Sequence, residues 1–487
     1  MTQIEAVAKG KPEPVISGPS QAGGIARFAL RAKYDDLTAE RRERLKVSIL
    51  DAVACAINAL GAPPIEACRA QADELGGPGG RCTLVGGGRA NPVYAAFYNT
   101  ALIRYVDFMD SYLARGGLCH PSDNTGAILA AGEHADLSGK DFLTALAVAY
   151  QVEAQLTASV PFMAHGFDLT TQLSYSLAAG LSKALGFDDQ TTAAAVGICG
   201  DFIPLLVART TPISQWKGLS SSHLALGCFH GVLLASRGVT GPRYVVEGTH
   251  GLAQALGEQI RIDWDRVKLD AFDRLALKSY NTAVPGQASI HCMLELRKAH
   301  AIDPAQVESI ENDAFQDAYD FMGGGSFGPK TDVHTKEQAD HSLPYLLAVA
   351  LLDGSVQPAQ LAPERIAKPD VQKLLRKVKV RPDESFTTRY PSETPSRVTV
   401  RLTSGKSYTH EVNDYPGFAT RPFTWDEIVA KLDNLAADRA DEGLRKEIVA
   451  AVRSLESIRV KDLMNLLARV DRRPRLVTQA DGIFSTH

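Results

Sequence analysis

A polar stretch between two apolar runs carries the side chains best suited to acid-base chemistry. It opens with Asp107 and Asp110, which are three residues apart, so their carboxylates would face one side of a helix. Ser111 follows directly, and Arg115-Gly116-Gly117 breaks the predicted helix. The stretch therefore offers two carboxylates and a hydroxyl near a helix end.

A histidine and small polar residues follow the break, in the order His120, Pro121, Ser122, Asp123 and Asn124. Ser122 or Asp123 is placed to cap a helix that begins near Ala127, and the amides at such a helix start attract anions. The alternative is a solvated loop, which the aspartates alone would favour. A histidine packed with hydroxyl and amide groups between two apolar helices favours a functional site.

Two lysines in polar segments are suited to hold a carboxylate. Lys217 lies in the polar run 210–222, and its ammonium is a compact charge with three donors; a surface position is the alternative. Lys278 lies where the pattern of the chain changes, so we expect it at a seam between two domains, where clefts usually form.

The elements that would position these groups are helices in the first part of the chain. Apolar residues at helical spacing predict a helix over 38–60, and alanine-rich helical patterns continue to about residue 265. From Thr424, which opens a capping box with Glu427, the chain is helical again to about Val470. We infer that this last segment returns to the first domain.

The pattern changes to short strands between these two helical parts. The clearest is a hairpin of 397–402 with 407–412, and helices over 286–300 and 339–352 interleave with the strands. We therefore predict a mainly α protein, with a large all-helical domain formed from both chain ends and a smaller inserted α+β lid domain. The predicted boundaries are a flexible N-terminal arm over 1–24, helical segments over 25–267 and 413–487, and the lid over 268–412.

Composition limits the classes of function. The chain has 487 residues, 45% hydrophobic and 22% charged, with a formal net charge of −4. This length suggests two domains, and the charge argues against a general nucleic-acid or membrane-surface partner. The N-terminal residues lack a signal-length apolar segment, and no later run is apolar enough to span a bilayer. The seven scattered cysteines include no CxxC pair, so we expect thiols in a reducing cytoplasm.

The patterns Asp107-Phe108-Met109-Asp110-Ser111 and His120-Pro121-Ser122-Asp123-Asn124 resemble the MmgE/PrpD family. This family includes 2-methylcitrate dehydratases, cis-aconitate decarboxylases and epimerases of related polycarboxylates. Further segments resemble it in the same order along most of the chain: Trp216-Lys217-Gly218, Lys278-Ser279-Tyr280, Ala339-Asp340-His341-Ser342-Leu343-Pro344-Tyr345 and Asp414-Tyr415-Pro416-Gly417. The resemblance implies the helical domain with its inserted lid, and a homodimer.

The chain departs from the family pattern at two places. Asn281 replaces a proline, and Leu169 stands where many relatives carry a histidine, in the run His165-Gly166-Phe167-Asp168-Leu169. Either His165 takes the role of that histidine from the other side of the turn, or the role is absent. In the segment around His341, Asp340 or Ser342 can cap a helix while His341 turns inward, so this motif either supports the site or belongs to the architecture.

The resemblance and the chemistry together give the expected roles. Lys217 and Lys278 bind and polarise carboxylates, assisted by the loop amides of Ser122, Asp123 and Asn124. His120 is the expected acid or base, because a free imidazole has a pKa of about 6.5. Asp107 and Asp110 orient it or share the proton transfer, and the substrate contacts are completed by Ser111, His165 and His341.

Metal ligands and cofactor motifs are sparse in the sequence. His120 with Asp123, or Asp107 with Asp110, could be metal ligands, but hard-metal sites gather more oxygen ligands and zinc sites more His or Cys. Aconitase-type dehydratases use an iron-sulfur cluster, and this chain has no cysteine spacing for one. We therefore expect acid-base catalysis without a metal or another cofactor.

The predicted function is dehydration of a 2-methylcitrate-like hydroxy polycarboxylate, as in propionate metabolism. The run from His120 to Asn124 resembles the dehydratases more than the decarboxylases, where a glycine tends to follow His-Pro-Ser. The first alternative is a cis-aconitate-type decarboxylase or an epimerase of a related polycarboxylate. The second is a noncatalytic scaffold that binds a carboxylate or a partner; Leu169 favours it, and the retained acid-base groups argue against it.

Overall fold

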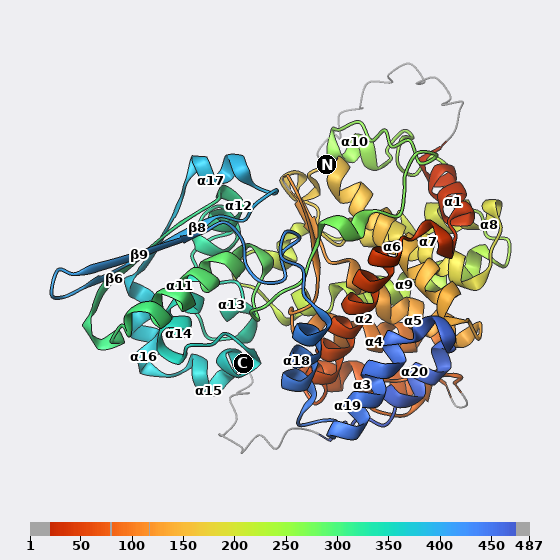
Figure 1. Ribbon diagram of the computed structural model, residues 1–487. Helices are drawn as coiled ribbons and strands as arrows, with labels where there is room; N and C mark the ends of the chain where they lie inside the picture. Colours follow the sequence, from red (N-terminus) through yellow and green to blue (C-terminus); the bar gives the residue numbers. More distant parts are fainter. Residues whose placement is uncertain (1–19, 78–79, 116, 474–487) are drawn as a thin grey trace, which may run out of the picture.

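The computed structural model describes residues 20–77, 80–115 and 117–473 of the chain. These residues form two packed regions that lie side by side (Figure 1). The larger, here called the helical region, has a buried cluster drawn from residues 22–277 and 428–470. The smaller, the mixed region, has a buried cluster drawn from residues 283–400. The chain is therefore mainly α-helical, with small sheets.

Helices from the first part of the chain build most of the helical region. They are α1 (Gln21–Arg31), α2 (Ala39–Ala59), α3 (Pro63–Leu75), α4 (Pro92–Tyr105), α5 (Thr125–His134), α6 (Gly139–Ser159), α7 (Thr171–Leu185), α8 (Asp189–Cys199), α9 (Ser220–Ala235) and α10 (Leu252–Leu256). The helix predicted over 38–60 is α2, and its N-cap Thr38 accepts a hydrogen bond from the backbone N–H of Arg41. A two-stranded ribbon, β1 (Cys82–Thr83) with β2 (Arg89–Ala90), lies between α3 and α4 in the chain.

The N-terminal arm predicted for residues 1–24 lies outside the described residues up to position 19. Within the described part the prediction was wrong, because residues 21–24 form the first turn of α1 and Ser20 caps it. Gly24 serves close packing here: a Cβ on it would lie 2.5 Å from the ring of Trp264.

The C-terminal helices pack on the helices that open the chain. They are α18 (Trp425–Ala436), α19 (Glu442–Arg453) and α20 (Val460–Leu467). Figure 1 shows these blue helices beside the red and orange ones, with α18 against α2 and α20 against α5. Thr424 and Glu427 form the predicted capping box at the start of α18. Both ends of the described chain therefore share one core.

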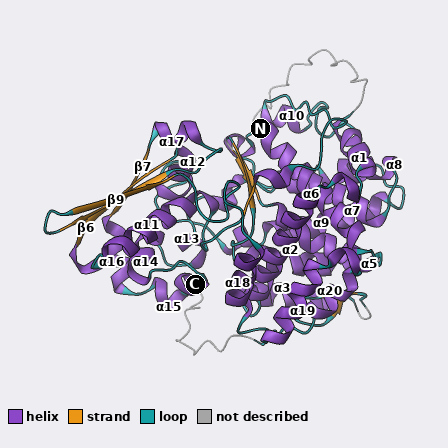
Figure 2. Cartoon of the chain, in the orientation of Figure 1, coloured by secondary structure: helices purple, strands orange, loops and turns teal. Residues whose placement is uncertain are grey.

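The mixed region is built on a four-stranded sheet with the order β7-β6-β8-β9 (Figure 2). Strand β6 (Val307–Ala314) pairs parallel with β7 (Val378–Pro382) and antiparallel with β8 (Ser396–Leu402), and β9 (Ser407–Val412) completes the predicted hairpin. The helices α11 (Gln287–His300) and α14 (Leu343–Asp353) pack on the sheet. Shorter helices complete the region: α12 (Gln316–Ala318), α13 (Lys336–Ala339), α15 (Pro363–Ile366), α16 (Pro369–Leu374) and α17 (Glu384–Arg389).

The prediction that the first domain is all-helical was wrong. A three-stranded antiparallel sheet with the order β4-β3-β5 consists of β3 (Ser111–Ala114), β4 (Gly117–Cys119) and β5 (Leu275–Ala276). Helix α4 ends before Asp107 and Asp110, so these carboxylates lie in a loop and not on a helix face. The strands are two to four residues long, which is too short for an alternating pattern to be recognised.

The predicted capping roles of Ser122 and Asp123 were also wrong. Both lie in a 3-10 turn, Pro121–Asn124, and the N-cap of α5, Asn124, makes no side-chain capping bond. The backbone N–H of Ser122 instead donates to Asp110 Oδ1 at 3.0 Å, and Asp123 Oδ2 accepts from Ser221 Oγ at 2.5 Å. The turn is thus fixed by contacts with distant segments.

Gly417 fixes the segment that carries Lys278. The backbone N–H of Leu277 donates to the Gly417 carbonyl at 2.7 Å. Gly417 has a φ of 96°, and a Cβ on it would lie 2.5 Å from the carbonyl oxygen of Leu277. Only glycine satisfies both the left-handed backbone and this close approach.

Replacing Gly417 by Ala is therefore expected to destabilise the protein by more than the about 1–2 kcal/mol that a left-handed alanine costs. The free energy of unfolding from denaturant titration measures this loss. Gly405→Ala is the matched control, because Gly405 has a φ of 86° but a Cβ on it would meet none of the described atoms within 4 Å. Equal losses in the two variants would contradict the packing role of Gly417.

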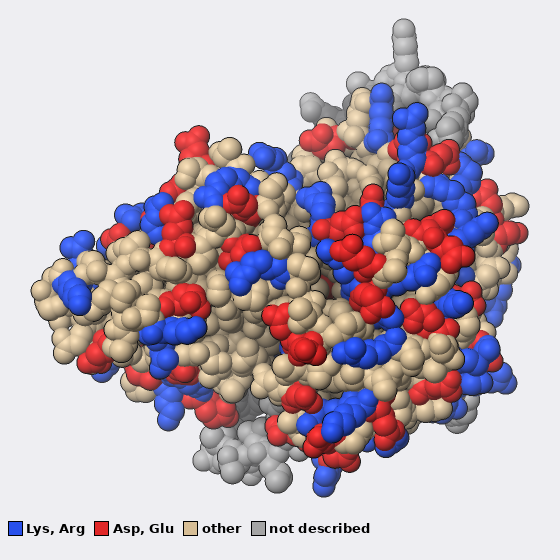
Figure 3. Space-filling model, in the orientation of Figure 1, with Lys and Arg blue, Asp and Glu red and all other residues tan. Residues whose placement is uncertain are grey.

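The surface carries charges of both signs. On the face shown in Figure 3, Lys and Arg side chains are interspersed with Asp and Glu over both regions. Among the described residues, no single helix is long and apolar enough to cross a membrane; α2 and α3 pass that test only as a pair, across a bend of 94°.

Candidate active site

A small cavity lies between the two regions. The helical region contributes Arg104, Asp107, Leu118, His120, Leu169 and Arg209, and the mixed region contributes Ala283, Val284, Pro285, Phe321 and His341. Its volume of about 10 Å³ is the room for about one water. Guanidinium, carboxylate and imidazole groups form one part of the wall, and aliphatic and aromatic side chains form the rest.

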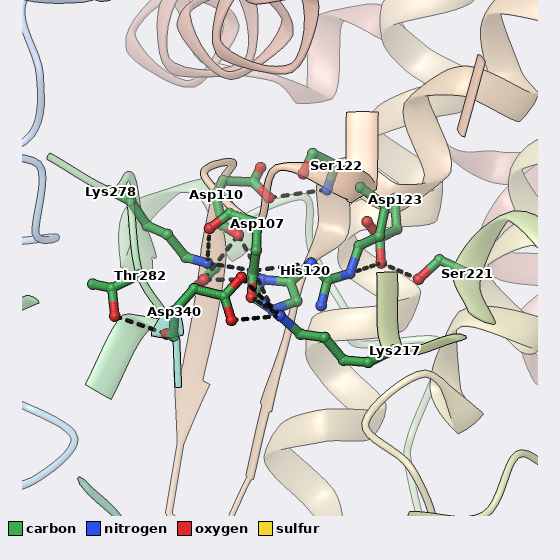
Figure 4. A network of polar contacts seen from close by, with 12 residues as sticks. Asp107, Asp110, His120, Ser122, Asp123, Lys217, Ser221, Lys278, Thr282 and Asp340 are labelled. Atoms are coloured by element: carbon green, nitrogen blue, oxygen red, sulfur yellow. Dashed lines mark hydrogen bonds and ion pairs between the residues drawn. The ribbon is translucent and has the colours of Figure 1, made fainter. Parts of the chain in front are cut away.

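Asp107 is the centre of the polar groups (Figure 4). Its Oδ1 lies 2.7 Å from Lys278 Nζ and 2.9 Å from an Arg104 guanidinium nitrogen, and its Oδ2 lies 2.7 Å from Lys217 Nζ. Burial alone would raise the pKa of this carboxyl, but the three cations hold it well below its usual range. Asp107 has a φ of 55°, an uncommon conformation for a residue with a side chain, which aims the carboxylate at all three cations.

Asp340 and His341 extend this cluster from the mixed region. Asp340 meets Lys217 Nζ at 3.2 Å and Lys336 Nζ at 2.9 Å. His341 Nδ1 donates to Asp340 Oδ1 at 2.5 Å, and burial together with Lys217 lowers the pKa of His341 to about 3, so the ring is neutral. Of the two predicted caps, Asp340 and Ser342, it is Ser342 that caps α14, and His341 is buried as predicted. Lys217 therefore joins the two regions through two carboxylates.

More cations than carboxylates meet in the cluster. Three cations contact Asp107, and Lys336 adds a fourth through Asp340. The third carboxylate is Asp123, 3.7 Å from Arg104 Nε, and burial raises its pKa to about 6. Glu337, which faces Lys336, is a fourth carboxylate, and Lys330, beside Lys217 and Asp340, is a fifth cation. The cations thus outnumber the carboxylates by one even when Asp123 is ionised. A buried charge without a counter-charge is costly, so the cluster is suited to bind an anion.

His120 is held as a neutral imidazole with a free Nε2. Its Nδ1 lies 2.8 Å from the carbonyl oxygen of Asp110, which can only accept, so Nδ1 carries the proton. The Ser111 hydroxyl also lies 3.0 Å from Nδ1 and donates to the same carbonyl. Burial, with the charges of Lys278 and Arg104, lowers the pKa of His120 well below its usual value. The lone pair of Nε2 is therefore available to accept a proton.

The structure separates the roles of Asp107 and Asp110. The Asp110 carboxylate accepts from the Ser122 N–H at 3.0 Å and is not part of the cavity wall. Burial raises its pKa to about 7. Through its carbonyl and its carboxylate, Asp110 orients His120 and the turn that follows. Ser111 likewise touches His120 and not the cavity.

The turn residues Ser122, Asp123 and Asn124 lie next to the site but do not line the cavity. Their side chains are buried and absent from the cavity wall. Asn124 Nδ2 donates to Glu153 Oε2 at 2.6 Å, and its Oδ1 accepts from Ser176. The structure therefore brings these residues next to the cluster without turning them toward a ligand.

His165 is not brought to the cavity. It is exposed, and its Nε2 lies 3.5 Å from a carboxylate oxygen of Glu258. Leu169, where the resemblance predicts a histidine, is 2% exposed and lines the cavity. The position thus faces the cavity and presents an apolar side chain to it.

Sequence patterns alone did not reveal two arginines of the site. Arg104 and Arg209 line the cavity, and both are almost fully buried. Arg209 makes a bidentate pair with Asp168, at 2.7 and 3.0 Å. The spacing of Arg104 three residues before Asp107 was the available signal. Arg209 is 41 residues from Asp168, and no local pattern links them.

The acidic and imidazole groups of the cluster are a poor fit to a metal ion. Asp107, Asp340 and His341 offer ligand atoms within 4.8 Å of one another. The ammonium of Lys217 lies 2.7, 3.2 and 3.3 Å from an atom of these three residues, respectively. These ligand atoms already surround the ammonium of Lys217. A divalent metal ion bound by them would lie in contact with this positive charge. The donor set fits an ammonium better than a metal.

Comparisons with known proteins cover nearly the whole described chain. Residues 23–265 match the MmgE/PrpD N-terminal domain, and residues 280–457 match the MmgE/PrpD C-terminal domain. The junction between the two matches falls close to Lys278, where the pattern of the sequence changes.

Three relatives illustrate the range of similar proteins. An alkylcitrate dehydratase of a fungal species is 24% identical, over 92% of this chain and 94% of its own. A cis-aconitate decarboxylase of Aspergillus terreus is 26% identical, over 91% and 94%. A 2-methylcitrate dehydratase of Salmonella typhi is 25% identical, over 77% and 81%.

Proposed function

Because the chain belongs to the MmgE/PrpD family, we propose that it is a lyase that removes water from a 2-methylcitrate-like hydroxy polycarboxylate. The relatives are named for dehydration of an alkylcitrate or 2-methylcitrate and for decarboxylation of cis-aconitate. The observation that carries the proposal is the surplus of buried cations around Asp107, next to a neutral His120 with a free Nε2. Anion binding and proton abstraction are thus available in one place.

Substrate carboxylates bind to the guanidinium groups of the cavity wall. Arg104 and Arg209 line the cavity, and a planar guanidinium matches a carboxylate in two parallel hydrogen bonds. Lys217 and Lys278 lie behind Asp107 and strengthen the positive potential there. This potential stabilises the charge that develops on a carboxylate when a proton leaves the adjacent carbon.

The elimination needs one base and one acid. His120 Nε2 takes the proton from the carbon α to a carboxylate, and the electron pair of that C–H bond forms the alkene as the C–O bond breaks. Burial lowers the pKa of Lys217 to about 8 in spite of Asp107 and Asp340, which places this acid near neutrality. Lys217 lies outside the wall of the closed cavity but joins Asp107 and Asp340 across the seam. Once the seam has opened and the substrate has entered, Lys217 gives its proton to the departing hydroxyl, which leaves as water.

The two regions must separate for the substrate to enter. A cavity of about 10 Å³ cannot hold a polycarboxylate, and its wall is shared between the regions. We propose that the mixed region acts as a lid that opens this seam and closes over the substrate. Closure then excludes water from the reacting groups.

Decarboxylation is the second candidate. It is favoured by cis-aconitate decarboxylases that match over most of this chain. The same cations would hold the carboxylates, and the carbanion-like intermediate would form by loss of carbon dioxide instead of a proton. The His-Pro-Ser-Asp-Asn run at residues 120–124 favours dehydration.

Incubation of chelator-treated protein with 2-methylcitrate, citrate and cis-aconitate tests the proposal. Alkene absorbance and carbon dioxide release are followed together. We expect alkene from a hydroxy acid, no carbon dioxide and no loss of rate after chelation. Carbon dioxide from cis-aconitate would move the assignment to the decarboxylase, and no reaction with any of the acids would contradict both.

The pH dependence of kcat/KM is expected to be bell-shaped. Lys217 must be protonated to act as the acid, so kcat/KM falls as the pH rises above about 8. His120 must be neutral to act as the base, and its lowered pKa places the loss of activity on the acid side well below pH 6.5. Initial rates over a pH series check both limbs. A basic limb that persists unchanged in Lys217→Met would contradict the assignment of Lys217.

We also propose a cytoplasmic homodimer with a place in propionate metabolism, as the resemblance to the family implies. All seven cysteines are free and buried, which suits a reducing compartment. The interspersed charges of Figure 3 offer no basic surface for nucleic acid on that face of the described residues. Light scattering tests the dimer: a mass of about twice 52.4 kDa is expected, and a mass of 52.4 kDa would contradict it.

A further inference from the structure

A wider cleft adjoins the catalytic cavity at the same seam. It has a volume of about 420 Å³, within the usual range for a small-molecule site. Leu118, Pro285 and Phe321 belong to the walls of both the cleft and the cavity. The two spaces are therefore neighbours, separated by these apolar side chains.

Phe321 stands at the boundary between them. Its ring contacts the ring of His341 at 5.0 Å between centroids, and on the cleft side it contacts Phe327 at 4.9 Å. It lies in a π-helical segment, Tyr319–Gly323, and such irregular turns are frequent at functional sites. A ligand that reaches His341 from the cleft must pass this ring.

The lining of the cleft is mostly apolar and aromatic. Met163 and Leu206 come from the helical region, and Phe327 and Tyr390 come from the mixed region. Leu169 continues this apolar wall into the catalytic cavity. The polar groups that would hold carboxylates are thus confined to one end of the combined space.

The charged groups in the cleft wall are acidic. Asp317 and Asp320 line it, and no lysine or arginine of the described chain does so. The Asp320 carboxylate accepts hydrogen bonds from Gln316 and Ser326 at 2.7 and 3.0 Å. Burial and the nearby Asp320 raise the pKa of Asp317, and the charge of Arg115, which is outside the cleft wall, opposes this rise. A carboxylate placed in this cleft would meet two acidic side chains, Thr210, Ser326 and apolar carbon, with no cation of the described chain in the wall.

We propose that the cleft binds an uncharged alkyl arm of the substrate while the cation cluster binds its carboxylates. The substrate class is then a hydroxy polycarboxylate that carries an alkyl chain longer than methyl. This inference rests on the proposed function. The apolar wall favours the chain, and Asp317 with Asp320 disfavours an arm that ends in a carboxylate.

A series of 2-alkylcitrates with methyl, butyl and hexyl arms tests the inference with the wild-type protein. Each CH2 group that becomes buried is expected to raise kcat/KM for alkene formation roughly fourfold, the ratio that corresponds to about 0.8 kcal/mol. A kcat/KM that is flat or falls from methyl to hexyl would overturn the inference.

Ala164→Phe narrows the cleft. Ala164 is exposed, lines the cleft and lies outside the catalytic cavity, so the variant is expected to fold and to keep its rate with 2-methylcitrate. The gain from methyl to hexyl should disappear, whereas the control Ala164→Ser should retain it. An undiminished chain-length gain in Ala164→Phe would place the arm elsewhere.

Asp317→Asn tests the acidic side of the cleft. The two substrates are a citrate with a butyl arm and one with a 3-carboxypropyl arm of similar length. Wild type is expected to prefer the butyl arm, and the ratio of the two kcat/KM values should shrink in Asp317→Asn. An unchanged ratio would contradict the role of this carboxylate.

Failure of the inference is distinguishable from failure of the proposed function. Turnover of 2-methylcitrate without any chain-length gain leaves dehydration in place and removes the alkyl site. If no acid is turned over, the binding of unreactive 2-alkylsuccinates is measured by calorimetry. An affinity that rises with chain length in wild type, but not in Ala164→Phe, supports the alkyl site. An affinity that does not depend on chain length contradicts it.

Discussion

Replacing His120 by Gln is expected to lower kcat for a hydroxy polycarboxylate by about 10²- to 10⁴-fold, the usual contribution of a positioned base. The reason is the geometry of the imidazole: Nδ1 donates to the Asp110 carbonyl at 2.8 Å, so Nε2 is the free proton acceptor at the cavity. Glutamine fills similar space but has no basic nitrogen. Steady-state rates with the substrate found in the panel measure the loss.

Folding and activity can be separated in this experiment. The thermal midpoint of His120→Gln should remain near that of wild type, because the glutamine amide can donate to the Asp110 carbonyl in place of Nδ1, and the Asp107 carboxylate is 4.0 Å from Nε2. His334→Gln is the matched control, since His334 is an exposed histidine whose bonds go to its neighbour Asp332 and to Gln338. Near wild-type turnover in His120→Gln would remove His120 as the base.

Replacing Lys217 by Met is expected to lower kcat/KM by about 10²- to 10³-fold, comparable to the loss of one preorganised donor in other active sites. The ammonium of Lys217 bonds to Asp107 at 2.7 Å and Asp340 at 3.2 Å, so the change removes an acid and a positive charge. It also leaves Asp107 with two cations in place of three. Kinetics with the same substrate measure the loss.

Two further variants separate charge from proton donation. Lys217→Arg keeps a positive charge but has a pKa too high to give up a proton near neutrality, so it should not restore the rate. Lys336→Gln removes one charge from the same cluster without touching the cavity. A loss of less than about tenfold is expected, because Lys336 contacts Asp340 and affects Lys217 only through its charge. Full activity in Lys217→Arg would show that charge alone is required.

Local patterns in the sequence predicted several of the helices. The periodic apolar pattern predicted α2, and the capping box at Thr424 predicted the start of α18. The alternating pattern of residues 397–412 predicted the hairpin β8–β9. The sheet of β3, β4 and β5 escaped because each strand is very short and β5 joins β3 from a distant part of the sequence. Such pairing depends on tertiary packing and leaves no local pattern.

The structure brings several of the predicted residues together, but the sequence did not predict their geometry. Asp107, His120, Lys217, Lys278 and His341 meet as a cluster, and the family resemblance named each of them. The positive φ of Asp107, which lets one carboxylate face three cations, has no signature in a residue type. Arg209 could not be found, because its partner Asp168 and the cavity are brought to it only by the fold.

The most direct measurement is proton NMR of chelator-treated protein with 2-methylcitrate in D₂O. Wild type is expected to form the alkene and, in the reverse direction, to place deuterium on the carbon α to a carboxylate, whereas His120→Gln should do neither at a comparable rate. Alkene formation at the wild-type rate in His120→Gln would contradict the mechanism, and no alkene or exchange with wild type would contradict the assignment of this acid as the substrate class.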